Sequence, residues 1–239
     1  MRAEYKNQVL SRLPRTEIAR FRPNLEPLLL PQNKDLSLPG ENALHGYFLE
    51  EGMASIVVTM HSGVSVEVGI VGREGLVGLP ILFGTGHTTT HTFMQIPGSG
   101  FRIKAQALKA EFERSGMFRV LCGRYFQSQL VQVSNYAACN RLHNIEQRLA
   151  RWLLLCQDKT GLSRLPLTHG FLSQMLGTGR TTVSLAAGVL QNSKLIFYSR
   201  GRVDILDRKG LEGAACECYQ TIRAEDARLN SLSKVPVSS

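Results

Sequence analysis

Four side chains at residues 180–185 combine the chemistry and the spacing needed to read the edges of nucleic-acid bases. Arg180 can donate two parallel hydrogen bonds, and Thr181 and Ser184 can each donate or accept. Leu185 adds an apolar contact. On a helix these positions share one face, because residues three and four apart are neighbours. Such a face at the N-terminal end of a helix can enter the major groove of DNA.

The residues around this face follow the pattern of a helix-turn-helix. Thr168 can cap a short first helix, and Gly177 can take the left-handed conformation that a steep turn requires. A second helix is predicted over residues 179–191. Its buried side would consist of Val183, Ala186 and Leu190. A helical hairpin without any ligand would give the same pattern, so the motif alone leaves that alternative open.

A β-hairpin is predicted directly after the second helix. Apolar residues at 195–197 and 203–205 flank a glycine-containing turn at 199–201. Arg200 and Arg202 lie in or beside this turn, where they could contact phosphate oxygens. The pattern therefore indicates a wing next to the helix-turn-helix.

The chain carries an excess of positive charge, and part of it lies in the same segment. The 239 residues include 28 Lys and Arg against 19 Asp and Glu, which gives a formal net charge of +9. Residues 164–209 hold seven basic residues but only two acidic ones, Asp204 and Asp207. A compact basic segment indicates a nucleic-acid partner, although a solvated basic surface would have the same composition.

The overall composition is that of a globular protein. Hydrophobic residues make up 43% and charged residues 20%, which excludes wholesale disorder. The longest apolar run, at residues 152–156, is far shorter than the roughly 20 residues that span a bilayer. The N-terminal residues do not resemble a signal peptide, and five cysteines do not suggest a disulfide scaffold. We expect a soluble, cytoplasmic protein with no membrane partner.

Residues 25–104 have the two-residue periodicity of β-strands. Apolar residues alternate over 54–60 and again over 64–70, and a turn with a glycine separates the two runs. Further glycines punctuate the segment, as expected for short strands joined by turns. We predict an N-terminal antiparallel β-roll, similar to a jelly roll, within a sensor domain at residues 1–116.

A long helix is predicted over residues 117–143, and it carries two apolar stripes. One stripe consists of Phe118, Cys122 and Tyr125, and the other of Phe126, Leu130, Val133 and Ala137. Two stripes need two covering surfaces. The β-roll could cover one, and the same helix of a second chain could cover the other, which would give a two-fold dimer. Burial of the whole helix within one chain is the alternative.

A second domain is expected after this helix, because Asn144 can cap a new helix that buries Trp152. We assign residues 144–230 to a winged helix-turn-helix domain and residues 231–239 to a disordered tail. The predicted fold class is therefore α+β: an N-terminal antiparallel β-roll, a long dimerisation helix and a C-terminal winged helix-turn-helix.

This order of elements resembles the superfamily of the cyclic-AMP receptor protein and the fumarate-nitrate regulator (Crp/Fnr), which are bacterial transcription factors. The motifs that carry the resemblance are RLARWLLL, LSQMLGTGRTTVSLAAGVL and KLIFYSRGRVDILD. They correspond to the start of the DNA-binding domain, the helix-turn-helix and the wing. The resemblance implies a homodimer that reads a pseudo-palindromic operator in double-stranded promoter DNA, with RNA polymerase as a further partner.

The resemblance also indicates which residues would contact DNA. The family's recognition helix commonly reads R-E-T-V-x-R, and Arg180 and Thr182 match its first arginine and its threonine. Thr181 replaces the family glutamate and Leu185 the second arginine, so the operator should differ from the commonest consensus. The expected DNA-binding set is Thr168, His169, Thr178, Arg180, Thr181, Thr182, Ser184, Leu185, Arg200 and Arg202.

The expected effector pocket departs from the family's cyclic-nucleotide cassette, which resembles G-E-x-x-L followed by R-S/T-A. Leu79 stands where the ribose-binding glutamate would be, and no arginine occurs between Arg73 and Arg102 to pair with the cyclic phosphate. We therefore expect that cyclic AMP does not bind tightly and that the effector, still unidentified, is another signal. The degenerate pocket would comprise Gly78, Leu79, His87, Thr88 and Thr89.

The sequence predicts no cofactor, no metal site and no enzyme. An N-terminal iron–sulfur cluster is excluded because the first cysteine is Cys122, whereas histidines in the β region leave haem sensing open. The short motif Cys216-Glu217-Cys218 is too isolated to indicate a metal site, and we interpret it as part of an ordinary terminal helix. The motifs G-x-S-x-G, H-E-x-x-H and the P-loop do not occur.

Two alternative functions stay open from the sequence. The chain could be a constitutive DNA-binding factor whose β-roll only supports the dimer, which effector-independent operator binding would favour. It could also be a ligand- or protein-binding module with vestigial DNA binding, which failure to bind any genomic fragment would favour.

Overall fold

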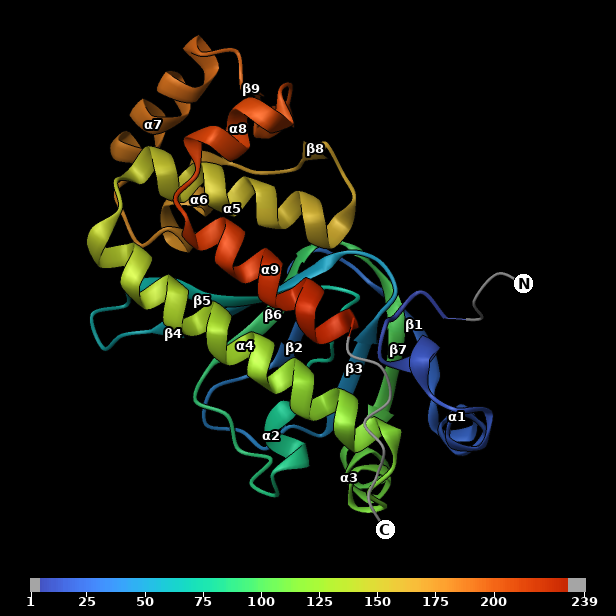
Figure 1. Cartoon of the computed structure of the whole chain (residues 1–239). Coiled ribbons are helices and arrows are strands. Elements are labelled where there is room, and N and C mark those ends of the chain that lie inside the picture. Colours follow the sequence, from blue (N-terminus) through green and yellow to red (C-terminus); the bar gives the residue numbers. More distant parts are fainter. Residues whose placement is uncertain (1–4, 232–239) are drawn as a thin grey trace.

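The computed structural model describes residues 5–231, and two antiparallel sheets form its N-terminal half (Figure 1). One sheet has the order β1 (Glu26–Leu30), β7 (Gly98–Lys104) and β3 (His45–Leu49). The other has the order β2 (Asp35–Ser37), β6 (His91–Ile96), β4 (Met53–Thr59) and β5 (Ser65–Val71). These sheets confirm the antiparallel architecture that the two-residue periodicity predicts.

The predicted hairpin is β4 and β5, but it is buried more fully than a one-sided strand would be. Along β4, Ser55 and Val57 are buried, and the alternating residues Ile56 and Val58 are half-buried. The register shifts between Ile56 and Val57, so a bulge twists the pair. Both faces are covered because the roll's own core lies on one side and C-terminal helices pack on the other.

Three helices complete the N-terminal part. They are α1 (Arg15–Phe21), the short α2 (Leu79–Leu82) and α3 (Ala105–Glu113). Phe21 of α1 packs edge-on against Phe48 of β3 and against Phe118 of the long helix that follows α3. The ring centroids are 6.1 and 4.8 Å apart. These aromatic contacts fasten the helical layer to the roll.

The long helix α4 (Met117–Leu142) follows closely the predicted helix at 117–143. Its N-terminus is capped from α1, since the Glu17 carboxylate accepts the N–H groups of Met117 and Phe118 at 2.8 and 3.0 Å. Farther along, Gln132 accepts the N–H of Ile70 in β5 at 2.7 Å. Helix α4 is therefore held to the roll by hydrogen bonds as well as by its buried apolar stripe.

The C-terminal part begins with α5 (Ile145–Thr160), and the predicted cap is confirmed. The Asn144 side chain accepts the N–H of Gln147 at 2.9 Å, and Gln147 bonds back to the N–H of Asn144. The remaining elements are β8 (Arg164–Leu165), α6 (His169–Met175), α7 (Arg180–Asn192), β9 (Ile196–Ser199), β10 (Arg202–Ile205), α8 (Arg208–Ala214) and α9 (Cys218–Ser231). Of the tail predicted at 231–239, everything after Ser231 lies outside the described residues.

The two halves of the chain share one hydrophobic core. Trp152 of α5 is buried among sheet residues such as Met53 and Ile70, and its indole N–H donates to the Glu67 carboxylate at 2.7 Å. Ser55 donates to the other Glu67 oxygen at 2.6 Å. The C-terminal domain is thus packed directly on β4–β5–β6 instead of being tethered by a linker.

A buried ion pair adds a second connection between the halves. The ammonium of Lys159 in α5 lies 2.9 Å from a Glu74 oxygen and 3.0 Å from an Asp226 oxygen in α9. Lys159 is 8% exposed, so the pair is shielded from solvent. Loss of Lys159 would leave the two carboxylates close together without a cation, which would be costly at a site shielded from solvent.

Among the described residues, no helix combines the length and the apolar character needed to cross a bilayer.

The buried Glu67 predicts a specific pH dependence of stability. Burial raises its pKa from 4.5 to about 7, with the hydrogen bonds from Ser55 and Trp152 opposing the shift. Between these values the folded chain holds a proton that the unfolded chain has lost, so the free energy of unfolding falls as pH rises. The full effect is about 3 kcal/mol.

The test is urea denaturation of wild type and Glu67→Gln at about pH 5 and about pH 8. We expect Glu67→Gln to lose this part of the pH dependence, because its amide stays neutral, and the exposed variant Glu51→Gln to keep it. Parallel pH profiles for wild type and Glu67→Gln would contradict the prediction.

Glycine substitutions at two positions of the C-terminal domain should act in opposite directions. Gly177 has φ +59°, and a Cβ there would lie 3.0 Å from Cγ2 of Val66 in β5. Gly177→Ala should lower the free energy of unfolding by about 1–2 kcal/mol. Gly188 lies within α7 with open space around it, so Gly188→Ala should raise it by about 0.5–1 kcal/mol. Denaturation that gives equal effects would contradict this contrast.

Candidate nucleic-acid interface

The predicted helix-turn-helix consists of α6 and α7. Thr168 caps α6 as predicted, since its hydroxyl accepts the N–H of Phe171 at 3.2 Å. The turn takes its left-handed residue at Gly177, again as predicted. Helix α7 buries Val183, Ala186 and Leu190 and turns its opposite face outward.

The N-terminal part of α7 is open to solvent. Arg180, Thr181 and Thr182 are exposed, and Leu185 is 68% exposed, so the sequence-predicted reading face is largely available. Thr178 lies half-buried in the turn before it. Gly179 is the N-cap residue, and no side chain caps the helix within the described residues. The first N–H groups of α7 can therefore donate hydrogen bonds to an anion such as a phosphate.

Gly170 is a site residue that sequence reasoning missed. The Arg180 side chain lies across it, and a Cβ at Gly170 would be 3.1 Å from Nη2 and 3.2 Å from Cζ of Arg180. A larger residue would push the guanidinium away from α6. No sequence signal identifies this role, because nothing in the sequence around Gly170 indicates that it lies against the Arg180 side chain.

His169 and Ser184, both predicted to contact DNA, contact each other. Nδ1 of His169 lies 3.0 Å from Oγ of Ser184, which also bonds to the Arg180 carbonyl oxygen. The imidazole stacks on the Tyr198 ring of β9, with centroids 3.9 Å apart and the planes 12° from parallel. Burial lowers the pKa of His169, which favours the neutral ring. These contacts tie α6, α7 and the wing together, and a direct role in DNA contact stays a prediction.

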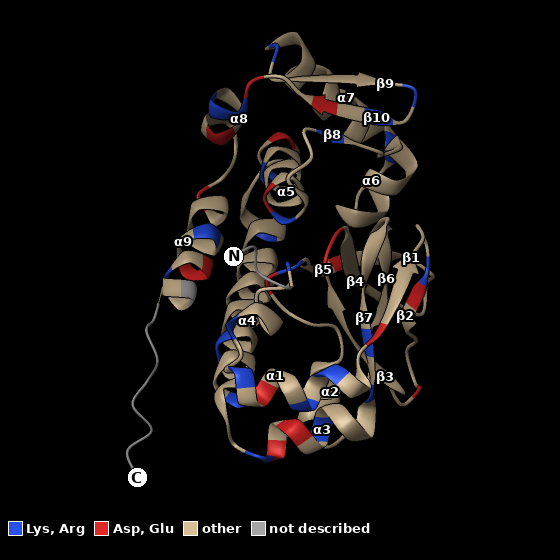
Figure 2. Ribbon diagram, turned by 90° about the vertical axis from the view of Figure 1, so that its right-hand side faces the viewer, with Lys and Arg blue, Asp and Glu red and all other residues tan. Residues whose placement is uncertain are grey.

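The wing is the hairpin of β9 and β10. Arg200 and Gly201 have φ 47° and 76°, the pair of left-handed residues typical of a two-residue hairpin turn. Figure 2 shows basic residues at this turn and next to it. Arg200 and Arg202 are exposed, and neither forms an ion pair within residues 5–231. Both guanidinium groups are available to phosphates.

Not every basic residue of the segment 164–209 belongs to this surface. Arg164 bonds Asp204 across β8 and β10 at 2.6 Å. Arg208 bonds Asp158 at 2.7 Å and Glu212 at 3.0 Å, so it fastens α8 to α5. The charge count from the sequence therefore overstates what is open to a ligand, and Arg180, Arg200 and Arg202 remain the arginines of the exposed face.

A separate pocket of about 500 Å³ lies between the β-roll and α4. It brings together Gly78, Leu79 and Thr88 of the predicted effector site. His87 and Thr89 do not line it, because they point outward and are exposed. The physical reason is strand-like alternation, which turns neighbouring side chains to opposite sides.

The pocket lining is mainly apolar and hydroxylic. Tyr125 and Gln129 of α4 form part of its wall, so a ligand there would touch the long helix directly. Leu79 lines it where a cyclic-nucleotide site would have its glutamate. No Lys, Arg, Asp or Glu is among the described residues that line the pocket. That the pocket does not bind cyclic AMP tightly stays a prediction.

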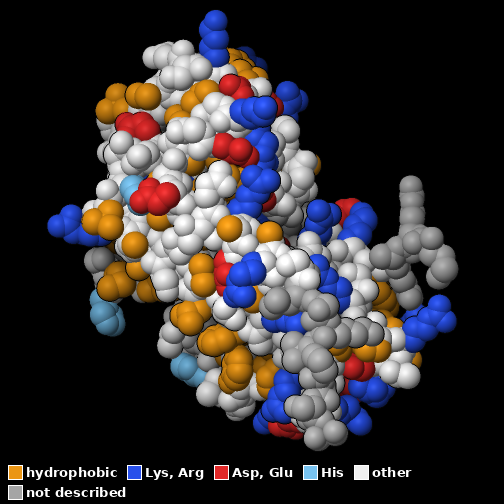
Figure 3. All heavy atoms as spheres, in the orientation of Figure 1, with side chains coloured by type: hydrophobic (Ala, Val, Ile, Leu, Met, Phe, Trp, Pro, Cys, Tyr) orange, Lys and Arg blue, Asp and Glu red, His pale blue; other side chains and the backbone are white. Residues whose placement is uncertain are grey.

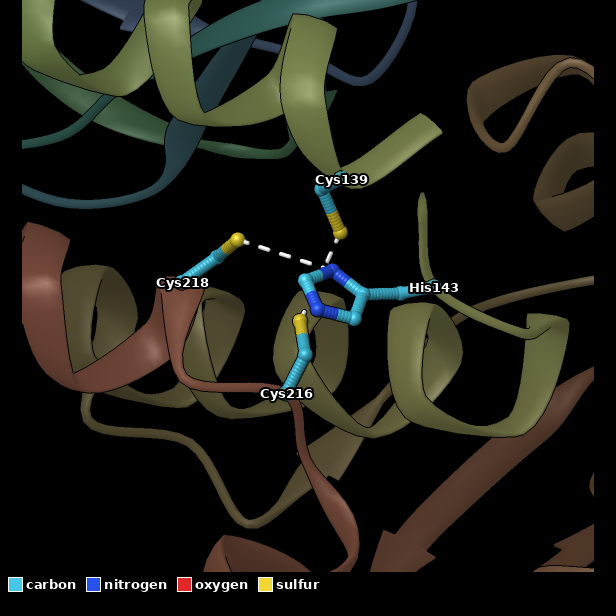
Figure 4. Close-up of side chains that lie close together, drawn as sticks. All are labelled: Cys139, His143, Cys216 and Cys218. Carbon is cyan, nitrogen blue, oxygen red and sulfur yellow. Dashed lines mark hydrogen bonds between the residues drawn. The ribbon is translucent and has the colours of Figure 1, made fainter. Parts of the chain in front are cut away.

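The interpretation of Cys216-Glu217-Cys218 as isolated was wrong. Figure 4 shows both cysteines together with Cys139 and His143 from the end of α4. One ligand atom of each of these four residues lies within 4.8 Å of the others. The two segments are far apart in the sequence, and only the packing of α9 along α4 brings them together.

Comparisons with known proteins agree with this arrangement. Residues 147–214 match the family of Crp-like helix-turn-helix domains. Over 188 residues the chain is 26% identical to the global nitrogen regulator of Nostoc sp., which covers 73% of this chain and 82% of that protein. It is 25% identical over 195 residues to the global nitrogen regulator of Synechococcus elongatus, covering 76% and 87% of the two chains.

Solved structures show the same fold across most of the chain. FixK2 from Bradyrhizobium japonicum superposes with a TM-score of 0.67 at 13% identity, covering 80% of this chain and 98% of that one. A transcriptional regulator of the CRP/FNR family from Thermus thermophilus gives 0.63 at 19% identity, with coverage of 80% and 98%. The helix-turn-helix, its wing and the antiparallel sheets thus occur in the order these proteins share, and residues 147–214 form a Crp-like helix-turn-helix domain.

Proposed function

We propose that this protein is a DNA-binding transcription regulator of the Crp/Fnr family, and that it acts as a homodimer that reads a pseudo-palindromic operator with α7 of each chain in the major groove. The observation that carries the proposal is the exposed N-terminal face of α7, where the Arg180 guanidinium is held against Gly170 and forms no ion pair within residues 5–231. Two half-sites would lie about 34 Å apart, one turn of the double helix.

Arg180 is proposed as the main base-reading residue. An arginine at the N-terminal end of a recognition helix can donate two hydrogen bonds to O6 and N7 of guanine. Leu185 is five residues after Arg180 and four after Thr181, is exposed, and suits a thymine methyl group. Thr181 can donate to or accept from either kind of base. Thr182 and the open N–H groups of α7 would contact the adjacent phosphates.

The wing is proposed to follow the phosphate backbone. Arg200 and Arg202 stand at the tip of a short hairpin whose base is fixed, since β10 pairs with both β8 and β9. Gln191 of α7 accepts the N–H of Tyr198 in β9 at 2.7 Å, so wing and recognition helix should move as one unit. Thr168 lies close to Gly201 at the wing turn and would belong to the same phosphate-binding edge.

The dimer is proposed to form through the second apolar stripe of α4, defined as Phe126, Leu130, Val133 and Ala137. The spacing of four, three and four residues is that of the core positions of a coiled coil. Phe126 is 45%, Leu130 56% and Val133 41% exposed even though α9 packs beside the same helix. Figure 3 shows hydrophobic side chains gathered along the course of α4. Burial against a second copy would remove this surface from water.

The pocket between the roll and α4 is proposed as the effector site. Its ligand would be an uncharged or weakly charged small molecule, because the described lining offers hydroxyl and amide groups and the His45 imidazole, whose pKa burial lowers, but no Lys or Arg. Cyclic AMP lacks a partner for its phosphate there. Tyr125 and Gln129 would transmit occupancy to α4 and so to the proposed dimer interface.

The function as a whole is tested by genomic DNA selection with the full chain, with and without cell extract and with cyclic AMP. We expect selected fragments to contain an inverted repeat and cyclic AMP to leave the selection unchanged. RNA polymerase recruitment at such a fragment would follow. Selection of no fragment at low salt would refute the proposal, and full binding without extract would favour the constitutive alternative.

Arg180→Ala should weaken operator binding by about 1–3 kcal/mol and relax specificity at one base pair in each half-site. The measurement is quantitative binding to the selected operator and to its single-base variants. Arg202→Ala is the matched control, and it should weaken all sequences equally and lower the salt slope by about 1. Uniform weakening by Arg180→Ala would make that residue a phosphate contact instead.

Leu130→Asp should dissociate the dimer, because it places a charge in the centre of the apolar stripe. Sedimentation of the full chain should then give a monomer with retained helical circular dichroism. Ala138→Asp, at an exposed position of α4 next to the stripe's end, should leave the dimer intact. A wild-type chain that sediments as a monomer would remove the dimer from the proposal.

A further inference from the structure

A cluster of three cysteines and one histidine lies where the end of α4 meets the connection between α8 and α9. Cys139 and His143 come from the last turn and the C-terminal cap of α4. Cys216 precedes α9, and Cys218 is its first residue. The three thiols are buried, with 0%, 3% and 4% exposure, and they form a small cluster of their own.

The distances within the cluster fit a single tetrahedral ion. Sγ of Cys139 lies 3.4 Å from Sγ of Cys216, and Sγ of Cys218 lies 3.7 Å from Nδ1 of His143. The edge of a tetrahedron with zinc–sulfur bonds of about 2.3 Å is about 3.8 Å. All four ligand atoms fall within 4.8 Å of one another, which suits one ion and not a multi-iron cluster.

The orientation of His143 is also that of a metal ligand. Its Nδ1 faces the sulfurs, while its Nε2 lies 3.0 Å from a carboxylate oxygen of Glu217. A carboxylate that holds the outer nitrogen fixes the ring and its tautomer, as in carboxylate–histidine–zinc arrangements. The middle residue of the Cys216-Glu217-Cys218 motif thus has a role of its own.

A buried cation beside the cluster forms no ion pair within the described residues, although the Glu67 carboxylate interacts with it electrostatically. Arg151 is 1% exposed, and its Nε and Nη1 have no hydrogen-bond partner within the described residues. Its guanidinium lies 4.1 Å from the centroid of the Tyr136 ring. A buried charge without compensation is costly. Three thiolates and one divalent ion would carry a net charge of −1 and supply that compensation.

We propose that Cys139, His143, Cys216 and Cys218 bind one Zn²⁺ ion in a closed, structural Cys₃His site. Binding replaces the three thiol protons, which go to solvent, and four bonds to the ion form without any redox step. The site joins two segments that are 77 residues apart between Cys139 and Cys216. It therefore clamps α9, which lies beyond the matched helix-turn-helix domain at 147–214, to the end of α4.

The first test measures metal in the purified full chain by mass spectrometry of the elements. We expect close to one Zn²⁺ per chain in wild type and close to none in the double variant Cys216→Ser/Cys218→Ser. The matched controls are Cys122→Ser and Cys156→Ser, which alter buried cysteines outside the cluster and should keep the ion. Wild type with no more zinc than the double variant, after zinc is added anaerobically to reduced protein, would overturn the proposal.

A second variant separates coordination from folding. Glu217 is exposed, so Glu217→Gln should fold normally, keep the stoichiometry and weaken zinc affinity about 10–100-fold in chelator competition. Co²⁺ added to zinc-free wild type should give the visible absorption of a tetrahedral thiolate site, and His143→Ala should alter it. The zinc assignment would be refuted by a Co²⁺ spectrum typical of octahedral coordination or by a different ion at the same stoichiometry. A Cys139–Cys216 disulfide, detected by mass analysis without reductant, would also refute it.

One consequence rests on the proposed function: zinc should hold the domain arrangement that binds the operator. Removing the ion should weaken operator binding by about 5–150-fold, the range of typical coupling between sites. The zinc measurements need no DNA. Zinc-loaded protein that binds no operator would therefore refute the function and leave the metal site standing, whereas operator binding by zinc-free protein would refute only the coupling.

Discussion

The packing of Trp152 on the β-roll is the contact on which the rest of the structure depends. Its indole ring packs α5 against the second sheet. Its hydrogen bond to Glu67 is directional, so it fixes the position of α5 on the sheet more closely than apolar contacts alone would. Helix α6 uses the same platform, since Phe171 packs edge-on against Phe93 of β6. The direction in which α7 presents its exposed face is therefore set by the N-terminal half of the chain. A movement of the sheet would be transmitted to the helix-turn-helix through these packed side chains.

Helix α4 contributes residues to three sites at different positions along its length. Its N-terminal half forms a wall of the pocket through Tyr125, its middle carries the exposed apolar stripe, and its C-terminal end supplies Cys139 and His143. A ligand, a second copy and a metal ion would thus all act on one rigid element. Buried polar residues of α4 such as Gln132, which accepts the Ile70 N–H, hold this helix to the roll in addition to its apolar contacts.

The sequence by itself determined the features that depend on local signals. The cap at Asn144, the left-handed turn at Gly177 and the hairpin turn at Arg200 were all predictable, because each depends on the conformational preferences of a few adjacent residues. The two stripes of α4 were predictable for the same reason, since helical periodicity states which residues share a face. Fold class and family followed from the order of these elements.

Only the tertiary structure decided which distant residues meet. Glu67 looks like an outward strand residue, yet it is buried because α5 covers that face. The stacking of His169 on Tyr198 of the wing is another contact that the sequence does not indicate. The Cys216-Glu217-Cys218 motif looks isolated, yet Cys139 completes it from a helix 77 residues earlier. Such contacts arise from the docking of whole helices, and the free energy of docking is spread over many apolar side chains that no short motif encodes.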